Sequence, residues 1–431
     1  MLEKLFKLRA HNTTVRTEVV AGMTTFLTMA YIIFVNPSIL ASAHMDHGAV
    51  FVATCLAAAV GCIIMGVYAN YPIAVAPGMG LNVFFTYTVV AKMGYSWQVA
   101  LGAVFLSGVI FVLLSLFKIR EWIINSIPTS LRIGIAAGIG LFLGFIALKN
   151  AGIVVGNPSP DVLVQLGDVR SPEVLLAALG FFLIIGFEAK KVKGGVLIAI
   201  LIVTVLSLIF GMNKFTGVIS MPPNPSAAFF KLDISGAFDV SMISVVFAFL
   251  FVELFDTAGT LMAVCQRGNL LDEKGNLPRL KKALLADSVA TMIGALFGTS
   301  SITSYIESGA GVEQGGRTGL TAVVVGILFL LALLFSPLAG MIPKYATAGA
   351  LFYVCTLMLS GLAHINWKDL TEAAPTVVAA IMMPMASSIA DGIALGFITY
   401  TLVKVLSGRF KDISISVWCL TVLFLVRFYF A

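Results

Sequence analysis

The sequence predicts an all-α polytopic membrane protein, on the basis of its composition and of a recurring apolar pattern. Of its 431 residues 59% are hydrophobic and only 11% are charged, whereas soluble domains carry about 25% charge. Apolar stretches close to the roughly 20 residues that span a bilayer recur along the whole chain. They are 19–40, 50–70, 98–117, 130–148, 193–211, 240–264, 319–338 and 347–363. Too few charges remain to cover a soluble surface, so we expect lipid to cover most of the protein.

The basic residues gather in short loops, and this pattern sets the expected orientation. Clusters precede the first span and follow the fourth, sixth and eighth, at Lys4–Arg16, Lys118–Arg120, Lys190–Lys193 and Arg267–Lys282. The loop 41–49 has no Lys or Arg. Because Lys and Arg stay on the cytoplasmic side, we predict a multi-pass protein of the cell (inner) membrane with a cytoplasmic N-terminus. The net charge of +6 is then an orientation signal, and we expect no nucleic-acid partner.

Enzyme and metal chemistry find little support in the sequence. The five cysteines are scattered, and no CxxC or mixed His/Cys cluster occurs. All four histidines fall in the N-terminal tail or in loops, so a nucleophile–base pair inside the membrane is missing. We therefore expect no catalytic residue, no metal and no cofactor. The basic N-terminus lacks a cleavage site after a short apolar core, so we expect the first span to remain in place.

Two short polar segments interrupt the apolar pattern at matching places. Residues 71–82 and 298–311 are rich in Gly, Pro, Ser and Thr, and long apolar runs flank both. Such backbone would leave amides unsatisfied in lipid, and it is tolerated only where protein or a polar cavity surrounds it. Matched interrupted spans in two halves indicate the substrate site of a secondary transporter.

The matching positions also predict an internal duplication. We expect a first repeat over 1–211 with seven spans, an extracellular linker over 212–239 containing three prolines, and a second repeat over 240–431. An odd number of spans per repeat turns the second copy upside down. The segments 372–387, 391–406 and 413–430 make the C-terminal count uncertain, and we predict fourteen spans with one of these pieces a half-span or a continuation.

Carboxylates inside spans are costly and are candidates for function. Glu253 and Asp256 are spaced i, i+3 and share a helical face. Two carboxylates in a low-dielectric site repel each other, so that one can take up and release a proton near neutral pH. We predict that they couple transport to protons, although Asp256 alternatively belongs to an exposed helix end. Glu307, in the second interrupted segment, is a candidate hydrogen-bond acceptor for a ligand, and Asn82 holds the comparable place in the first segment.

Weaker candidates complete the predicted binding site. The interrupted segments add Met79, Gly80, Thr303 and Ser304, and the threonine stripe of the first span adds Thr25. A threonine also satisfies itself by bonding back along its own helix, so both interpretations of Thr25 stay open. For Asp287, Glu313 and Asp391 we expect structural roles at helix ends or helix contacts.

Four motifs in this order resemble the AzgA-like purine permeases of the nucleobase–ascorbate transporter superfamily, which take adenine, hypoxanthine or guanine. The first covers residues 16–31 with Asn36-Pro37. The others are Ala76-Pro77-Gly78-Met79-Gly80-Leu81-Asn82, Phe255-Asp256-Thr257-Ala258-Gly259-Thr260, and Tyr305-Ile306-Glu307-Ser308 with Gly315-Gly316-Arg317-Thr318-Gly319-Leu320.

The resemblance implies a 7+7 inverted repeat, with a core domain from 18–117 and 240–338 and a gate domain from 127–211 and 345–431. It implies short strands in spans 3 and 10, a purine nucleobase as substrate, proton symport by alternating access, and a homodimer. Carried over by position, Asn82, Glu307 and either Glu253 or Asp256 hold the base. The alternatives are a uracil, xanthine or anion transporter on the same fold, or a channel, which would need rings of repeated charge or carbonyl groups.

Overall fold

The computed structural model describes residues 2–116, 127–159, 163–272 and 277–430, so that Lys118, Arg120 and Lys274 of the predicted basic clusters lie outside it. In the described chain, nine helical segments are long and apolar enough to cross a membrane. They are Val15–Ala41, His47–Ala69, Trp97–Leu116, Thr129–Asn150, Pro172–Ala189, Ser241–Arg267, Gly319–Met341, Lys344–His364 and Ile389–Leu406. Shorter apolar helices cover Gly195–Ile209, Leu370–Ala386 and Ile415–Tyr429.

The helices of the first half begin with a short terminal helix, and several of the long ones are broken. They are α1 (Leu2–Phe6), α2 (Val15–Met29), α3 (Ile32–Ala41), α4 (His47–Ile64), α5 (Met79–Val83), α6 (Trp97–Leu116), α8 (Thr129–Asn150), α9 (Pro172–Ala189) and α10 (Gly195–Ile209). Two π-helical stretches, Met65–Ala69 and Phe84–Lys92, continue α4 and α5. Such stretches are rare and are often found at functional sites.

The helices of the second half follow a similar order. They are α11 (Val240–Arg267), α12 (Leu280–Phe297), α13 (Ser308–Glu313), α14 (Gly319–Ala332), α15 (Ser336–Met341), α16 (Lys344–Leu359), α17 (Leu370–Ala386), α18 (Ile389–Leu406) and α19 (Ile415–Phe430). The C-terminal region thus forms three separate helices. Asp391, in the first turn of α18, accepts a 2.6 Å hydrogen bond from Arg427 of α19, which is the structural role expected for it.

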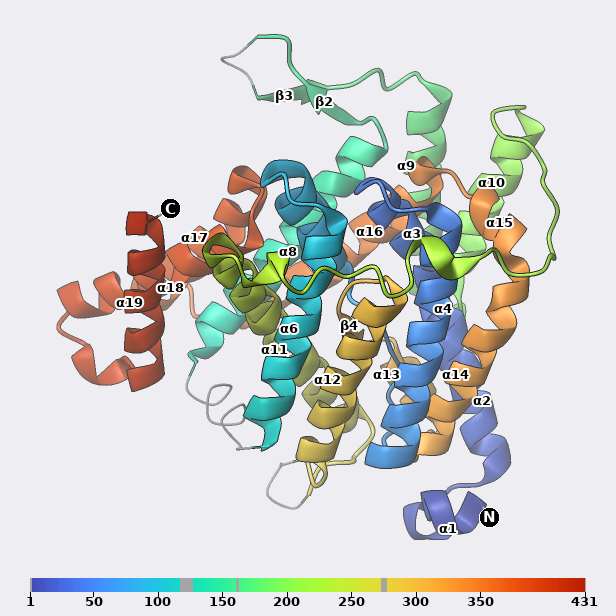
Figure 1. Ribbon diagram of the computed structural model, residues 1–431, viewed down its shortest axis with the longest axis horizontal. Helices are drawn as coiled ribbons and strands as arrows, with labels where there is room; N and C mark the ends of the chain where they lie inside the picture. The colour runs from blue at the N-terminus through green and yellow to red at the C-terminus, as the bar shows by residue number, and fades with distance from the viewer. Residues whose placement is uncertain (1, 117–126, 160–162, 273–276, 431) are drawn as a thin grey trace.

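Helices from both halves mix in two packing groups. In one group α4 packs against α12 and α14, α2 packs against α14, and α6 packs against α11 and α12. In the other α8 packs against α16 and α17, α9 packs against α10 and α16, and α17 packs against α18. Figure 1 shows α4, α12 and α14 side by side, with α17, α18 and α19 on the opposite flank. A β-hairpin of β2 (Val154–Gly156) and β3 (Val164–Leu166) lies at one end of the molecule and α1 at the other (Figure 1).

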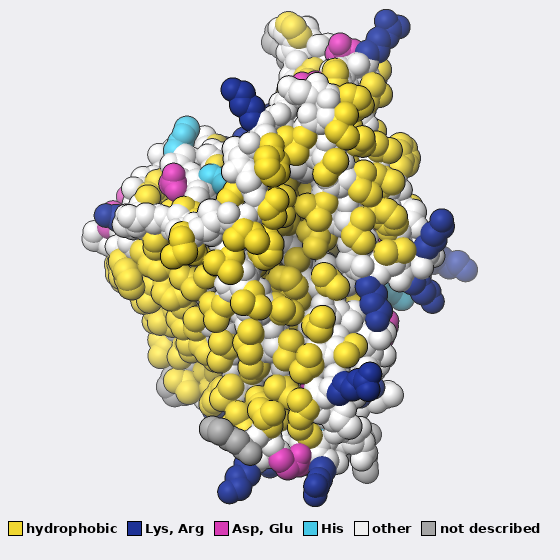
Figure 2. Space-filling model, turned by 90° about the vertical axis from the view of Figure 1, so that its right-hand side faces the viewer, with side chains coloured by type: hydrophobic (Ala, Val, Ile, Leu, Met, Phe, Trp, Pro, Cys, Tyr) yellow, Lys and Arg dark blue, Asp and Glu magenta, His cyan; other side chains and the backbone are white. Residues whose placement is uncertain are grey.

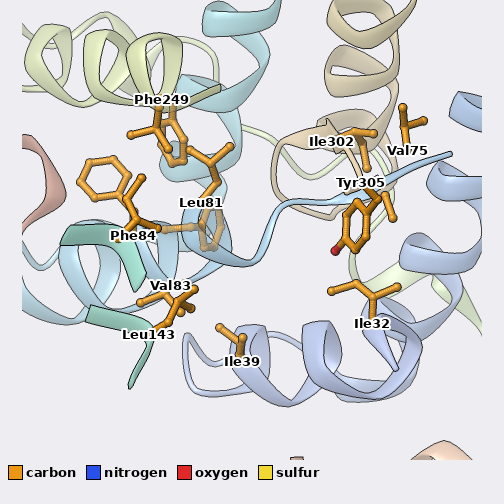
Figure 3. Packing of buried hydrophobic residues seen from close by; sticks show 14 of the residues in the cluster. Ile32, Ile39, Val75, Leu81, Val83, Phe84, Leu143, Phe249, Ile302 and Tyr305 are labelled. Atoms are coloured by element: carbon orange, nitrogen blue, oxygen red, sulfur yellow. The ribbon is translucent and has the colours of Figure 1, made fainter. Parts of the chain in front are cut away.

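Two further strands occupy the interrupted segments. β1 (Val75–Pro77) and β4 (Ile302–Ser304) are buried along their whole length and pair with each other. Apolar side chains surround them. Figure 3 shows Ile32 of α3 and Tyr305, which follows β4, near the strand residues Val75 and Ile302. In the same view Leu81 and Phe84 lie close to Phe249 of α11, and the Phe84 and Phe249 rings make an edge contact at 5.0 Å.

The outer surface is that of a protein in lipid. Figure 2 shows hydrophobic side chains over the middle of one face, with Lys and Arg mainly at its ends and margin. Exposed apolar residues of this kind include Met23 of α2 and Ile327 and Leu331 of α14. Apolar surface over this width would aggregate in water, so the structure describes a multi-pass membrane protein.

Candidate functional site

The site is built around the pairing of β1 with β4. The strands run antiparallel, with Ala76 opposite Thr303, and the pairing is extended by two backbone hydrogen bonds beyond the strand ends. These are Gly78 N–H to the Ser301 carbonyl at 2.9 Å and Tyr305 N–H to the Ala74 carbonyl at 3.0 Å. The strands satisfy each other's amides inside the protein. Because they are antiparallel, α5 and α13 lead away from them in opposite directions and both turn their N-terminal ends toward them.

Glycine at position 78 permits this close approach. A Cβ there would lie 2.8 Å from Thr303 Oγ1 and 3.0 Å from Thr303 Cγ2. Contacts this short force a neighbour to move, and this neighbour is fixed on a buried strand. The predicted site residue Thr303 therefore packs directly against the turn that links β1 to α5.

Glu253 of α11 is fully buried beside the strand pair. Its Oε1 accepts a 2.8 Å hydrogen bond from the Thr291 hydroxyl of α12, and its Oε2 accepts one from the Ser301 hydroxyl. The Thr291 hydroxyl also lies 2.9 Å from the carbonyl of Ile302 in β4. Hydroxyl donors of this kind hold a carboxylate in one orientation, and they join α11, α12 and β4 at one point.

Asp256 and Asp287 lie one step further along the same region. Asp256, half-buried, is hydrogen-bonded to the Thr303 side chain. Asp287 of α12 is fully buried and accepts hydrogen bonds from Thr257 at 2.8 Å and from Ser304 at 3.3 Å. We expected a structural role for Asp287 at a helix contact. Its partner Ser304 is a strand residue, so Asp287 also belongs to the shell that supports the site.

Glu307 lies immediately before α13 and is half-buried. Its Oε1 accepts a 2.5 Å hydrogen bond from the Tyr31 hydroxyl at the end of α2. The Thr28 hydroxyl lies 3.4 Å from the Glu307 carbonyl, and the Tyr305 hydroxyl donates to the Pro77 carbonyl of β1 at 2.6 Å. The carboxylate is thus oriented from one side by a phenol. Tyr31 is the last residue of the first motif, 16–31, yet sequence reasoning did not select it.

Asn82 lies in the first turns of α5 and is fully buried. Its Oδ1 accepts a hydrogen bond from the Ser300 hydroxyl, while its Nδ2 has no hydrogen-bond partner among the described residues. The two interrupted segments are therefore linked by side chains as well as by backbone.

Met79 and Gly80 begin α5, and both are half-buried. A Cβ at Gly80 would lie 2.5 Å from Ile139 Cγ2 of α8. This contact joins the strand-bearing group of helices to the other packing group. Gly80 therefore allows α5 to approach α8 closely.

Thr25 stands apart from this cluster. It is fully buried and packs against the backbone of α13, where a Cβ at Gly311 would lie 2.1 Å from Thr25 Oγ1. Its hydroxyl has no hydrogen-bond partner among the described residues. The structure brings Asn82, Glu253, Asp256, Thr303 and Ser304 to the strand pair and places Thr25 at a helix–helix contact.

Two other carboxylates have structural partners. Glu18 of α2, fully buried, accepts backbone N–H bonds from Arg317, Thr318 and Thr321 and so caps α14. Glu313 lies 3.8 Å from Arg267, which agrees with the structural role expected for it. In the described part of the chain no group of three or more His, Cys, Asp or Glu side chains could hold a metal ion. The arrangement offers carboxylates, hydroxyls and an amide, which suit a neutral polar ligand with N–H groups.

The sequence of this chain is similar to a family of known proteins along most of its length. Residues 16–395 match the model of the Permease family. The adenine permease AdeP of Escherichia coli (strain K12) is 51% identical over 430 residues, covering 100% of this chain and 96% of that protein. The guanine/hypoxanthine permease PbuG of Bacillus subtilis (strain 168) is 45% identical over 441 residues, covering 100% of both chains.

A solved structure shares the fold at low sequence identity. The transmembrane domain of the cyanobacterial bicarbonate transporter BicA aligns with a TM-score of 0.65 and 16% identity, over 87% of this chain and 96% of that one. At this identity the likeness concerns the fold alone.

Proposed function

The chain belongs to the Permease family, and on that premise we propose that it is a purine nucleobase transporter that imports adenine together with protons, with hypoxanthine and guanine as further candidate substrates. It is a transporter and not an enzyme. The observation that carries the substrate class is the identity over the full chain to permeases named for adenine and for guanine and hypoxanthine. The polar groups gathered at the β1–β4 pair supply the binding chemistry.

The ligand is assigned to the region between the strand pair and the neighbouring helices. Glu307 is half-buried and its two carboxylate oxygens keep acceptor capacity beyond the bond from Tyr31, so it suits a ring or exocyclic N–H of a purine. Met79, Gly80, Thr303, Ser304 and Asn82 would complete the binding surface. Thr25 would act through the packing of α2 against α13, because its hydroxyl faces the α13 backbone.

Coupling protons are assigned to Glu253 and Asp256. Both lie on α11, and their bonds to Ser301, the residue before β4, and to Thr303 of β4 tie them to the segment that lines the proposed site. Protonation of either group changes it from an acceptor to a donor and would therefore alter its bond to β4. No cofactor is needed, since the proton gradient supplies the energy.

Transport would proceed by alternating access. We assign the core domain to 18–117 and 240–338 and the gate domain to 127–211 and 345–431, with 1–211 and 240–431 related as two inverted repeats of seven spans. The mixing of both halves in each packing group supports this division. We further propose a cytoplasmic N-terminus, an extracellular linker at 212–239, a location in the inner membrane and a homodimer.

Uptake in cells that lack purine permeases tests this function. Radiolabelled adenine, hypoxanthine and guanine are offered with and without a protonophore, and surface expression is measured in parallel. Saturable adenine uptake that the protonophore abolishes supports a proton-coupled purine carrier. Uptake that resists the protonophore rejects the coupling. Absence of uptake of all three bases, in a protein present in the membrane, rejects the substrate class and favours uracil, xanthine or an anion.

A further inference from the structure

Three buried polar atoms near the strand pair have no hydrogen-bond partner in the described part of the chain. They are Asn36 Oδ1, Asn82 Nδ2 and Thr86 Oγ1, and all three side chains are fully buried. Leaving such an atom unsatisfied costs folding free energy, because the group gives up its hydrogen bonds to water and gains none in the protein. Folded proteins avoid this cost with internal water, which bonds to two or more polar groups at once.

These atoms lie close together on neighbouring elements. Asn82 and Thr86 are spaced i, i+4 along α5 and its π-helical continuation, so they share a helical face. α3, which carries Asn36, packs against both parts of that helix. Asn36 donates to Thr299 at 2.8 Å and to Thr54 at 2.7 Å. Asn82 is bonded to Ser300, the residue that follows Thr299 in the chain. The two asparagines are therefore bonded to neighbouring residues of the same segment.

The same polar cluster is continuous with Glu253. Ser301 follows Thr299 and Ser300 in the chain, and its hydroxyl is bonded to Glu253 Oε2. The Thr291 hydroxyl lies 3.4 Å from that of Ser301 and 2.8 Å from Glu253 Oε1. The row of neutral polar groups thus ends at a buried carboxylate.

A surface pocket lies at the far ends of the two elements that carry Asn36 and Thr86. A pocket of about 510 Å³ lies where α3 and the Phe84–Lys92 stretch end, and its lining includes Ser42, Val90 and Tyr95. Val90 is one helical turn beyond Thr86, and Ser42 follows the last turn of the helix that carries Asn36. In the proposed orientation this pocket faces the outside of the cell.

We propose that this cluster of Asn36, Asn82, Thr86, Thr299 and Ser300 holds water and forms the route by which protons pass from the outer pocket to Glu253. The inference rests on the proposed proton coupling. A hydronium ion in the pocket would give its extra proton to the first internal water, and successive transfers would deliver a proton to the Ser301 hydroxyl. Ser301 would pass its own proton to Glu253 Oε2, which becomes a neutral carboxylic acid, and the starting hydronium becomes water.

Among the described residues, the ionisable groups placed near the Glu253 end of this route are carboxylates, whereas His44 lines the pocket at its entrance. Asp256 lies on the same helix as Glu253, Asp287 faces it from α12 through Thr257 and Ser304, and Glu307 follows β4. A positive charge entering this region is therefore stabilised. Each hydroxyl or water on the route carries the positive charge only while it passes the proton on, and it is neutral again afterwards.

Thr86→Val tests the route, because valine keeps the shape of threonine and removes the hydroxyl. Thr204→Val is the matched control, since Thr204 is also buried in a helix and its hydroxyl donates to the Ile200 carbonyl of its own helix at 2.8 Å. Thr86→Ser restores the hydroxyl. For purified proteins in liposomes we would measure adenine binding, adenine exchange at equal pH, and uptake driven by an imposed inward proton gradient.

The proposal expects gradient-driven uptake of Thr86→Val to fall about tenfold, the effect of losing one buried hydrogen-bonding group, while binding and exchange stay at wild-type values. Exchange at equal pH needs no net proton flow. Thr86→Ser and Thr204→Val should retain gradient-driven uptake. Unchanged gradient-driven uptake in Thr86→Val would overturn the route alone. Equal losses of binding, exchange and driven uptake would also overturn it, since Thr86 would then have a structural or binding role. Wild-type exchange with no response to the gradient would overturn both the route and the proposed proton coupling.

Discussion

The Tyr31 hydroxyl donates a 2.5 Å hydrogen bond to the Glu307 carboxylate, although the two residues are 276 positions apart in the chain. The bond joins the end of α2 to the start of α13. It leaves Glu307 with one orientation and with free acceptor capacity toward the strand pair. A ligand that bonds to Glu307 therefore meets a carboxylate that is already in place, and this saves the entropy of ordering it.

Tyr31→Phe should weaken adenine binding. Hydrogen bonds to charged groups are worth about 1.5–3 kcal/mol, and part of this would appear as a rise of roughly tenfold in Kd. Equilibrium binding to the purified protein measures it. Tyr345→Phe is a suitable control, because Tyr345 is bonded to Ser207 in the other packing group at 2.5 Å and should leave Kd unchanged. Equal Kd values for Tyr31→Phe and the wild type would contradict this role for Tyr31.

Glu18→Gln should destabilise the protein without changing the binding constant of the folded molecules. The Glu18 carboxylate accepts three backbone N–H bonds at the start of α14 and a 2.6 Å bond from the Thr321 hydroxyl. The amide replaces one acceptor oxygen with a donor, at a cost of about 1–3 kcal/mol. Thermal unfolding in detergent should show a lower Tm, whereas exposed Glu173→Gln should not. A normal Tm with weakened adenine binding would instead place Glu18 in the binding site.

Gly80→Ala should disfavour the conformation described here. The added methyl group would lie 2.5 Å from Ile139 Cγ2 and 3.9 Å from Ile139 Cβ. The clash is therefore with this one side chain. Since α5 lies in the proposed core domain and α8 in the proposed gate domain, the clash acts on the contact between the proposed core and gate. Uptake should fall and should recover in Gly80→Ala/Ile139→Ala. If the double variant transports no better than the single one, the contact does not control the movement.

Thr291→Val should lower stability through β4. The Thr291 hydroxyl lies within hydrogen-bonding distance of both Glu253 and the Ile302 carbonyl, and valine leaves both without this partner. We expect a loss of about 1–3 kcal/mol of unfolding free energy, seen as a lower Tm. Thr204→Val serves as the control here too, because it also removes a buried hydroxyl. A Tm equal to that of the control would show that this hydroxyl is dispensable.

The sequence alone predicts the membrane class, most spans and the two interrupted segments, because these depend on local composition. Glu253, Asp256 and Glu307 could be selected because carboxylates are rare in apolar runs. Tyr31, Thr291 and Asp287 could not, because their importance comes from partners on other elements. The buried state of Glu18 is equally invisible in the sequence, since the groups that donate hydrogen bonds to it lie beyond residue 316. Three-dimensional packing alone assigns Thr25 and Gly80 to helix contacts.

The central claim is that Glu307 at the β1–β4 pair binds a purine base, and equilibrium binding of radiolabelled adenine to purified Glu307→Gln tests it most directly. The amide keeps the size of the side chain and replaces one acceptor oxygen with a donor. The account predicts that tight adenine binding is lost while expression, monodispersity and Tm stay near those of the wild type. Near-normal affinity in the well-folded variant would contradict it.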